Sequence, residues 1–234
     1  MTHRFFVDDE VGDEVVLRGG QARQIANVLR LEADAHITVV HDAIESEVRL
    51  ESVAADEVRG RCVARRSVGT EPRVRLTLAL PILRGDRTEE VLEAATQLGV
   101  SRFVPFVSAR SVVRTLTAAK RERWARVARE AAETARRGRI PAIDEARAWD
   151  RLFAALEPPV LVAWEGEALT MLGAALPESR ALSVVIGPEG GLAMDEIAFA
   201  RDQGAVSVSL GRRNLRSETA AIAAVAQVMA ALDT

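Results

Sequence analysis

The chain has 234 residues, 48% of them hydrophobic and 28% charged, so it can bury a sizeable core and is not disordered throughout. It contains neither an apolar run of the roughly 20 residues that span a bilayer nor an N-terminal signal-peptide pattern. One cysteine and three histidines exclude an internal disulfide and disfavour a metal site. We therefore expect a cytoplasmic protein with no membrane or metal partner.

The N-terminal residues 1–70 predict a small β-barrel. Alternating or Val- and Ile-rich segments predict strands at 4–7, 14–17, 36–40, 46–53 and 57–66. A helical pattern at 20–30 interrupts them, and the polar stretch 66–72 is typical of a linker. Several short strands at close spacing favour a barrel.

From residue 73 the pattern changes to strands that alternate with helices. The expected strands are 73–81, 102–108, 159–164, 182–187 and 206–211. The expected helices run from Thr88 to Gly99, from Thr117 to Gly138, at 194–203 and at 217–232. This alternation predicts an α/β fold with a parallel sheet covered on both faces. In such sheets, ligands bind beyond the carboxyl ends of the strands.

The net charge of −3 conceals an uneven distribution. Residues 1–70 hold nine arginines against 13 carboxylates, a charge of −4, whereas residues 102–147 hold 12 cations against five carboxylates, a charge of +7. A local basic zone on a mildly acidic chain can attract a polyanion.

The turn GPEGG at 187–191 follows a predicted buried strand. One interpretation is a tight strand-to-helix turn in which glycine supplies a positive φ. The other is a backbone cradle for a cofactor. A nucleotide phosphate fits poorly, because Glu189 would repel it and the glycine spacing matches no phosphate loop. A ligand with an adenine, a sugar and a positive charge, such as S-adenosylmethionine, fits better.

The segment LGRRNLRSETA at 210–220 combines a strand end, three arginines and the start of an alanine-rich helix. It is either a solvated basic loop with an ordinary N-cap or part of a site. Arg216 and Glu218 flank the helix start close to the strand ends, where a substrate and a cofactor would meet.

Together, IGPEGG and LGxRxLRxETA resemble the C-terminal signature of the bacterial 16S rRNA uridine-N3 methyltransferases (the RsmE family) of the SPOUT superfamily. The resemblance continues, in order, through RFFV (4–7), VLRL (28–31), LRGDRTEEVLEAATQLGV (83–100), RSV (110–112), RW (123–124) and EAAETARRGRIP (130–141). The chain departs from the family pattern at Gln24, Ala94 and Gln97, where members usually have histidine, lysine and glutamate.

This resemblance implies a PUA-like β-barrel for RNA binding over 1–70 and a SPOUT methyltransferase domain with a C-terminal deep trefoil knot over 71–234. It implies a homodimer that methylates N3 of a uridine in 16S rRNA of the small ribosomal subunit, with S-adenosylmethionine as cofactor. The matching cofactor-binding positions are Leu161, Val162, Glu165, Gly187, Pro188, Glu189, Gly190, Gly191, Leu210, Gly211, Leu215, Arg216 and Thr219.

For RNA binding, Arg4 in RFFV and Arg30 in VLRL match N-terminal arginines of the family. Four further candidates lie in the basic zone, namely Arg110, Arg114, Arg136 and Arg137, and each of the six could equally form a surface ion pair. Arg216, helped by Arg4, is our candidate for stabilising negative charge on the uracil oxygens. Glu218 either accepts the N3 proton or orients Arg216, and we favour orientation. Three alternatives remain, of which a dinucleotide or ATP enzyme is disfavoured by Glu189. The others are a methyltransferase for another RNA position, such as a ribose 2′-oxygen, and a non-catalytic RNA-binding assembly factor.

Overall fold

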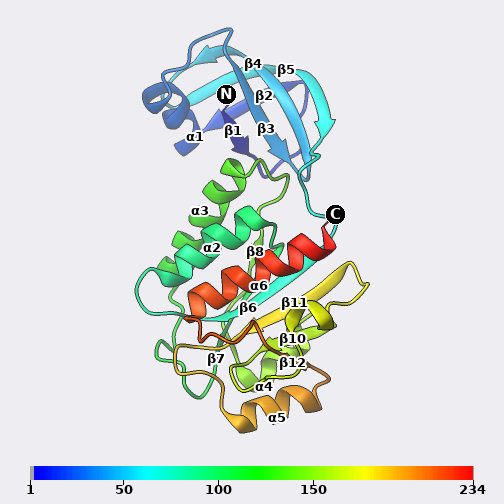
Figure 1. Cartoon of the computed structure of the whole chain (residues 1–234). Helices are drawn as coiled ribbons and strands as arrows, with labels where there is room; N and C mark the ends of the chain where they lie inside the picture. The colour runs from blue at the N-terminus through cyan, green and yellow to red at the C-terminus, as the bar shows by residue number, and fades with distance from the viewer. Residues whose placement is uncertain (1–2, 234) are drawn as a thin grey trace. The chain divides into compact units, whose positions relative to one another are not determined.

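The alternating N-terminal segments form one five-stranded sheet in the computed structural model, which describes residues 3–233 (Figure 1). Its strands are β1 (Arg4–Phe6), β2 (Glu14–Arg18), β3 (His36–His41), β4 (Ile44–Val53) and β5 (Glu57–Ser67). They are ordered β1-β3-β4-β5-β2, with β1 parallel to β3 and the other neighbours antiparallel. Val15 and Leu17 of β2 are buried and their neighbours exposed, as expected for a sheet with one solvated face.

The described residues divide into two units, and the division differs from the expected one at a single segment. The first unit contains the chain up to Glu71 together with Glu133–Arg139, and the second contains Pro72–Ala132 and the chain from Ile140 onward. Residues 133–139 therefore belong with the N-terminal sheet, although we expected the whole chain after residue 70 to form the second domain.

The Glu71 carboxylate explains why this segment joins the first unit. It accepts hydrogen bonds from Arg137 Nε (3.2 Å) and Nη2 (3.1 Å) and from the backbone N–H groups of Gly138 (2.7 Å) and Arg139 (3.2 Å). Burial by itself would raise the pKa of Glu71, but the Arg137 guanidinium and the two N–H groups outweigh it and lower the pKa below its ordinary value. The nearly buried ion pair between Glu71 and Arg137 thus holds residues 133–139 in place.

The second unit contains a parallel sheet, as predicted. Its strands are β6 (Arg75–Pro81), β7 (Arg102–Val107), β8 (Ala142–Ile143), β9 (Arg147–Ala148), β10 (Val160–Ala163), β11 (Ala181–Ile186) and β12 (Val206–Val208). They are ordered β12-β10-β11-β6-β7-β8, and β9 pairs with the far end of β7. The long strands are almost continuously apolar because both faces of the sheet are covered.

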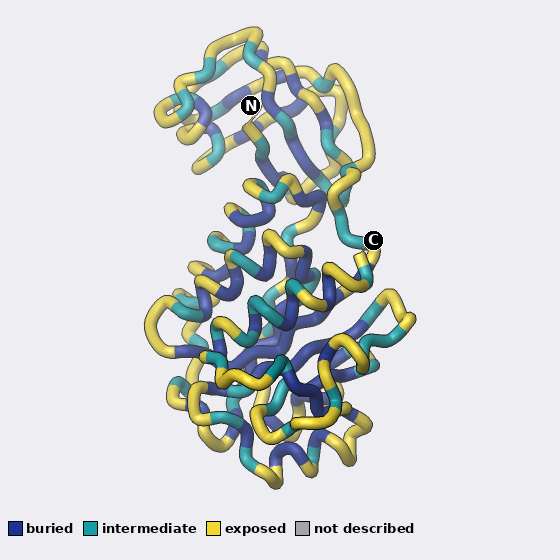
Figure 2. The backbone as a smooth tube through the Cα atoms, viewed as in Figure 1, coloured by how far each residue is buried: buried dark blue, intermediate teal, exposed yellow. Residues whose placement is uncertain are grey.

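The strands of this sheet are mostly buried (Figure 2). Two buried clusters cover its two faces. On β6, Leu78 and Leu80 point into one cluster and Ala79 into the other, which is the period of two expected for a strand. The first cluster includes side chains of α2 (Arg87–Leu98), α3 (Ala118–Thr134) and α6 (Ser217–Leu232). The second includes side chains of α4 (Trp149–Leu152), the 3-10 turn η2 (Phe153–Ala155) and α5 (Met194–Asp202).

Several elements differ from those expected. The helix expected at 20–30 is a short α1 (Gly20–Arg23) followed by a π-helical turn η1 (Gln24–Val28). The short strands β8 and β9, the helix α4 and the 3-10 turns η2 and η3 (Leu172–Ala175) were not predicted, because two to four residues show no period. Thr88 does not cap α2 but lies inside it, and its hydroxyl accepts the Leu83 N–H at 3.0 Å, which folds the loop before the helix.

No helix among residues 3–233 is both long and apolar enough to cross a membrane. Within the same range, no three His, Cys, Asp or Glu side chains are grouped so that they could hold a metal ion.

Replacing Arg137 with alanine should destabilise the first unit by about 3–5 kcal/mol, because it leaves the Glu71 carboxylate buried without its partner. Hydrogen exchange of the β3–β5 amides measures this loss. Arg139→Ala is the matched control, since Arg139 and Asp42 form an exposed pair at 2.9 Å that should contribute about 0–1 kcal/mol. Equal losses in both variants would contradict a structural role for the buried pair.

Because of Glu71, we also expect the stability of the first unit to decrease at acidic pH. Its pKa is lower in the folded than in the unfolded chain, so its contribution to stability is present above the unfolded value of about 4.3 and is lost as the pH falls through the folded value. Glu71→Gln should remove this part of the acid-induced loss, measured by denaturant unfolding of both proteins over a series of pH values.

Candidate active site

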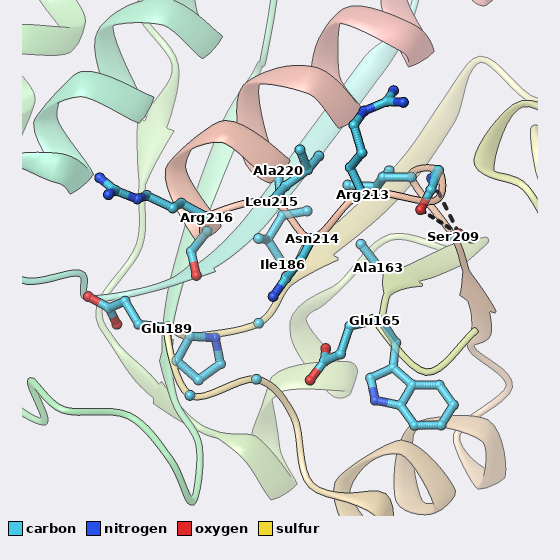
Figure 3. Close-up of a pocket in the computed structure, with 18 of the residues that line it drawn as sticks. Ala163, Glu165, Ile186, Glu189, Ser209, Arg213, Asn214, Leu215, Arg216 and Ala220 are labelled. Carbon is cyan, nitrogen blue, oxygen red and sulfur yellow. Dashed lines mark hydrogen bonds between the residues drawn. The ribbon is translucent and has the colours of Figure 1, made fainter. Parts of the chain in front are cut away.

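The carboxyl ends of three adjacent strands surround a cavity of about 900 Å³ in the second unit (Figure 3). The segments after β10, β11 and β12 form its walls, and Arg87 of α2 completes them. The lining residues are Arg87, Ala163, Trp164, Glu165, Ile186, Gly187, Pro188, Glu189, Gly190, Gly191, Ser209, Leu210, Gly211, Arg212, Arg213, Asn214, Leu215, Arg216, Ser217 and Ala220. The cavity wall therefore combines charged and amide side chains with the backbone of four glycines.

The GPEGG turn after β11 needs its last glycine for two reasons. Gly191 has a φ of 71°, and a Cβ built on it would overlap the Glu165 carboxylate. Gly191 N–H donates to the Pro188 carbonyl at 2.8 Å and closes the turn. The positive φ is thus what requires glycine here, and the missing side chain leaves room for the Glu165 carboxylate of the β10 loop.

Glu189 does not depend on a ligand to balance its charge. Its Oε1 accepts the Arg84 N–H at 3.1 Å and lies 3.9 Å from Arg87 Nη1. Arg87 Nε in turn lies 3.7 Å from Glu218 Oε1. The protein itself therefore supplies a cation and an N–H donor to the Glu189 carboxylate.

Glu167 holds the loop after β10. Its carboxylate accepts hydrogen bonds from the Ser207 hydroxyl (2.7 Å) and from the N–H groups of Leu169 (2.9 Å) and Thr170 (3.2 Å), and Arg201 lies 3.6 Å away. These donors, the Ser207 hydroxyl foremost, lower the pKa of Glu167 to about 2. The loop is therefore tied to β12, and its residues Trp164 and Glu165 stand at the cavity.

Ten of the predicted cofactor positions line the cavity, namely Glu165, Gly187, Pro188, Glu189, Gly190, Gly191, Leu210, Gly211, Leu215 and Arg216. The structure does not bring Leu161, Val162 and Thr219 to it. The Leu161 and Val162 side chains are buried on opposite faces of β10, one in each core cluster. Thr219 is exposed on the first turn of α6.

The three predicted catalytic residues lie in different surroundings. Arg216 lines the cavity just before α6, although its guanidinium extends away from the centre toward the side of Glu189 (Figure 3). Glu218 does not line the cavity, and its Oε2 is buried without a hydrogen-bond partner among the described residues. Arg4 belongs to the first unit, where it donates to Glu45 Oε2 (2.7 Å) and the Arg137 carbonyl (2.8 Å). Arg4 is thus a structural residue of the N-terminal sheet.

The six predicted RNA-binding arginines also separate into groups. Arg4 and Arg137 have only 9% and 3% of their side chains exposed, so neither is available to a polyanion. The other four, Arg30, Arg110, Arg114 and Arg136, are exposed. Arg110 has a further contact, because its Nη1 donates to the Gly190 carbonyl at 3.1 Å and its side chain covers the GPEGG turn.

Sequence reasoning missed several lining residues. The loop after β12 contributes four of them, Ser209, Arg212, Arg213 and Asn214. Their positions beside predicted residues of the same loop were the signal that could have identified them. Arg87 lies far before the other lining residues in the chain, the next of which is Ala163. Its only signal is its position in LRGDRTEE, a segment that resembles the RsmE family.

Comparison with known proteins shows the family of this chain. Residues 70–229 match the family model for an RNA methyltransferase domain. Ribosomal RNA small subunit methyltransferase E of Bacillus subtilis is 32% identical over 225 residues, which are 91% of this chain and 88% of the relative. Its counterpart in Mycobacterium tuberculosis is 33% identical over 238 residues, 96% of this chain and 90% of the relative.

Two solved structures are similar over nearly their whole length. Ribosomal RNA small subunit methyltransferase E from Neisseria gonorrhoeae, bound to S-adenosyl methionine, has a TM-score of 0.90 at 27% identity over 98% of each chain. A methyltransferase from Legionella pneumophila, in complex with the cofactor SAM, has a TM-score of 0.91 at 28% identity over 99% of this chain and 98% of its own. The chain belongs to the RNA methyltransferase domain family and, within it, to the family of ribosomal RNA small subunit methyltransferase E.

Gly191→Ala should destabilise the second unit by about 1–3 kcal/mol, because alanine would be strained at this φ and its methyl group would displace Glu165. The second unit holds all three tryptophans, so fluorescence-monitored unfolding measures the effect. Gly173→Ala is the control, since a Cβ there meets no atom within 4 Å and the φ is not positive. A Gly191→Ala protein as stable as this control would contradict the need for glycine.

Proposed function

We propose that this protein transfers a methyl group from S-adenosylmethionine to N3 of a uridine in 16S rRNA of the small ribosomal subunit. Family membership supports the reaction class and the ribosomal substrate. The observation that carries the proposal is the cavity, because glycine-rich backbone and carboxylates meet there at the carboxyl ends of three parallel strands. We place this activity in the cytoplasm, where small subunits are assembled.

The residues at the cavity fit S-adenosylmethionine better than a phosphate-bearing cofactor. Glu165 and Glu189 both line it, and Figure 3 shows the Glu165 carboxylate pointing into the space between the loops. A carboxylate in this position attracts a sulfonium and repels a polyphosphate.

The cofactor supplies an electrophilic methyl group and leaves as a neutral thioether. The N3–H of uracil is an imide proton and would have to be lost to solvent first, because the protonated nitrogen has no available lone pair. The N3 anion could then bond to the methyl carbon as the carbon–sulfur bond breaks. The chain's own task is to align the base in a site sheltered from water and to place cations beside the uracil oxygens. Arg216, at the cavity and at the start of α6, can supply one of these cations.

For the architecture, we propose that the second unit is a SPOUT domain whose C-terminal segment forms a deep trefoil knot. The order of the strands supports this, since β10 lies between β11 and β12 and the chain then returns from β12 to α6, which packs against α2, β6 and β11. The five mainly antiparallel strands of the first unit, in the order β1-β3-β4-β5-β2, support a PUA-like barrel.

The remaining proposals concern partners. Arg30, Arg110, Arg114 and Arg136 are exposed and can neutralise RNA phosphates, which would make small-subunit binding strongly dependent on salt.

A homodimer follows from the family resemblance. It is supported by the exposed apolar side chains of Leu169, Met171 and Val206 around the β12 edge, which a second copy would cover.

Methyl transfer in vitro to isolated small subunits, with the product mapped to base and atom, tests the proposed reaction. N3-methyluridine in 16S rRNA is the expected product. A 2′-O-methylated ribose would show instead that the enzyme acts on another RNA position. Absence of S-adenosylmethionine binding in calorimetry would favour a non-catalytic assembly factor.

Arg216→Ala should lower kcat by about 10²–10³-fold, the effect typical of removing one preorganised donor, while the protein stays folded because the side chain is exposed. Single-turnover methylation of small subunits measures the loss. Arg75→Ala is the control, since Arg75 is exposed at the opposite end of β6 and pairs with Glu157. Wild-type turnover in Arg216→Ala would disprove our assignment of this residue.

A further inference from the structure

Arg87 occupies an unusual position at the cavity. It is the first residue of α2, and 39% of its side chain is exposed. Its guanidinium lies between two carboxylates, with Nη1 3.9 Å from Glu189 Oε1 and Nε 3.7 Å from Glu218 Oε1. These two carboxylates come from the loop after β11 and from the first turn of α6, so they hold Arg87 from two different segments.

The Arg87 donors are nevertheless still available. Both distances are those of an ion pair and are too long for hydrogen bonds, and the Arg87 guanidinium donates no hydrogen bond to another described residue. Glu218 Oε2 is likewise buried without a partner within residues 3–233. A guanidinium has five N–H donors, so Arg87 can turn some of them toward a ligand while the two carboxylates keep its charge in place. Catalytic hydrogen bonds are often long before the substrate binds and tighten in the complex.

Arg216 lacks such a support. No carboxylate of a described residue lies within ion-pair distance of it, and its guanidinium extends away from the centre of the cavity (Figure 3). Preorganised charge is the main source of electrostatic catalysis, because no reorganisation is then needed during the reaction. Of these two arginines, only Arg87 is held by carboxylates of the protein.

We propose that Arg87 is a catalytic residue whose guanidinium contacts an oxygen of the target uracil, and that Glu189 and Glu218 are its positioning residues. This inference rests on the proposed function. Loss of the N3 proton leaves negative charge shared between N3 and the two uracil oxygens. Arg87 stabilises that charge while the N3 lone pair forms the bond to the methyl carbon. It gives up no proton itself, since an arginine stays protonated in proteins.

The test compares Arg87→Ala, Arg87→Lys and wild type in single-turnover methylation of small subunits. Arg87→Ala should lower kcat by about 10²–10³-fold, and Arg87→Lys should retain an intermediate rate, because lysine keeps the charge but loses the planar fork. Without the cation the N3 proton is harder to remove, so the rate of Arg87→Ala should continue to rise with pH where the wild-type rate has levelled off.

Two further measurements separate catalysis from folding. Calorimetry with S-adenosylmethionine should give wild-type affinity for Arg87→Ala, and Arg123→Ala is a matched control for the rate. Arg123 also lies near two carboxylates at the start of α2, Asp86 (3.2 Å) and Glu89 (3.5 Å), but it does not line the cavity. Its replacement should leave kcat unchanged.

Three results would overturn the inference. The first is a wild-type rate in Arg87→Ala. The second is a loss of kcat matched by an equal loss of cofactor affinity, which would make Arg87 part of the cofactor pocket only. The third is a wild-type rate in Arg87→Lys combined with an Arg87→Ala protein that does not fold, which would show a purely structural charge. If the wild-type protein itself forms no N3-methyluridine, the proposed function fails instead.

Discussion

The site depends on the hydrogen bonding of β10 to two parallel neighbours, β11 on one side and β12 on the other. In this register Ala163 stands opposite Ile186 of β11 and Val208 of β12, so the three strands end at the same level. Their following loops must then meet at one edge of the sheet, which is where ligands bind in open α/β folds. Segments 20 to 50 residues apart in the chain thereby become walls of one cavity.

Carboxylates that accept backbone N–H groups hold these loops in place. Glu167 fixes the loop after β10 through Leu169 and Thr170, and Glu189 joins the loop after β11 to Arg84. The buried Glu196 accepts the N–H groups of Ala109 (2.7 Å) and Ala193 (2.9 Å), which ties the end of β7 to the start of α5. Hydrogen bonds to charged acceptors are stronger than those between neutral groups. A site built from irregular backbone can therefore be well ordered before any ligand arrives.

In the N-terminal unit, too, a carboxylate that accepts backbone N–H groups holds a segment in place. Glu71 binds the Arg137 guanidinium and two backbone N–H groups, so that a segment following α3 becomes part of the five-stranded sheet's unit. Arg4 and Arg137, which looked like RNA ligands in the sequence, are used inside this unit. Exposure distinguishes them from Arg30, Arg114 and Arg136, although the sequence offered all five as RNA-binding candidates.

The sequence by itself determined the strand and helix pattern, the parallel sheet, and the two glycine- and arginine-containing loops that line the cavity. These features are local, because they follow from the period of apolar residues and from turn residues at fixed spacing. Only the tertiary structure decided which side chains face the cavity. Leu161 and Val162 are adjacent to the loop but buried on opposite faces of β10, since alternate side chains of a strand point in opposite directions. Arg87 is distant in the chain but belongs to the site, because the pairing of β6 with β11 brings the start of α2 beside the GPEGG turn.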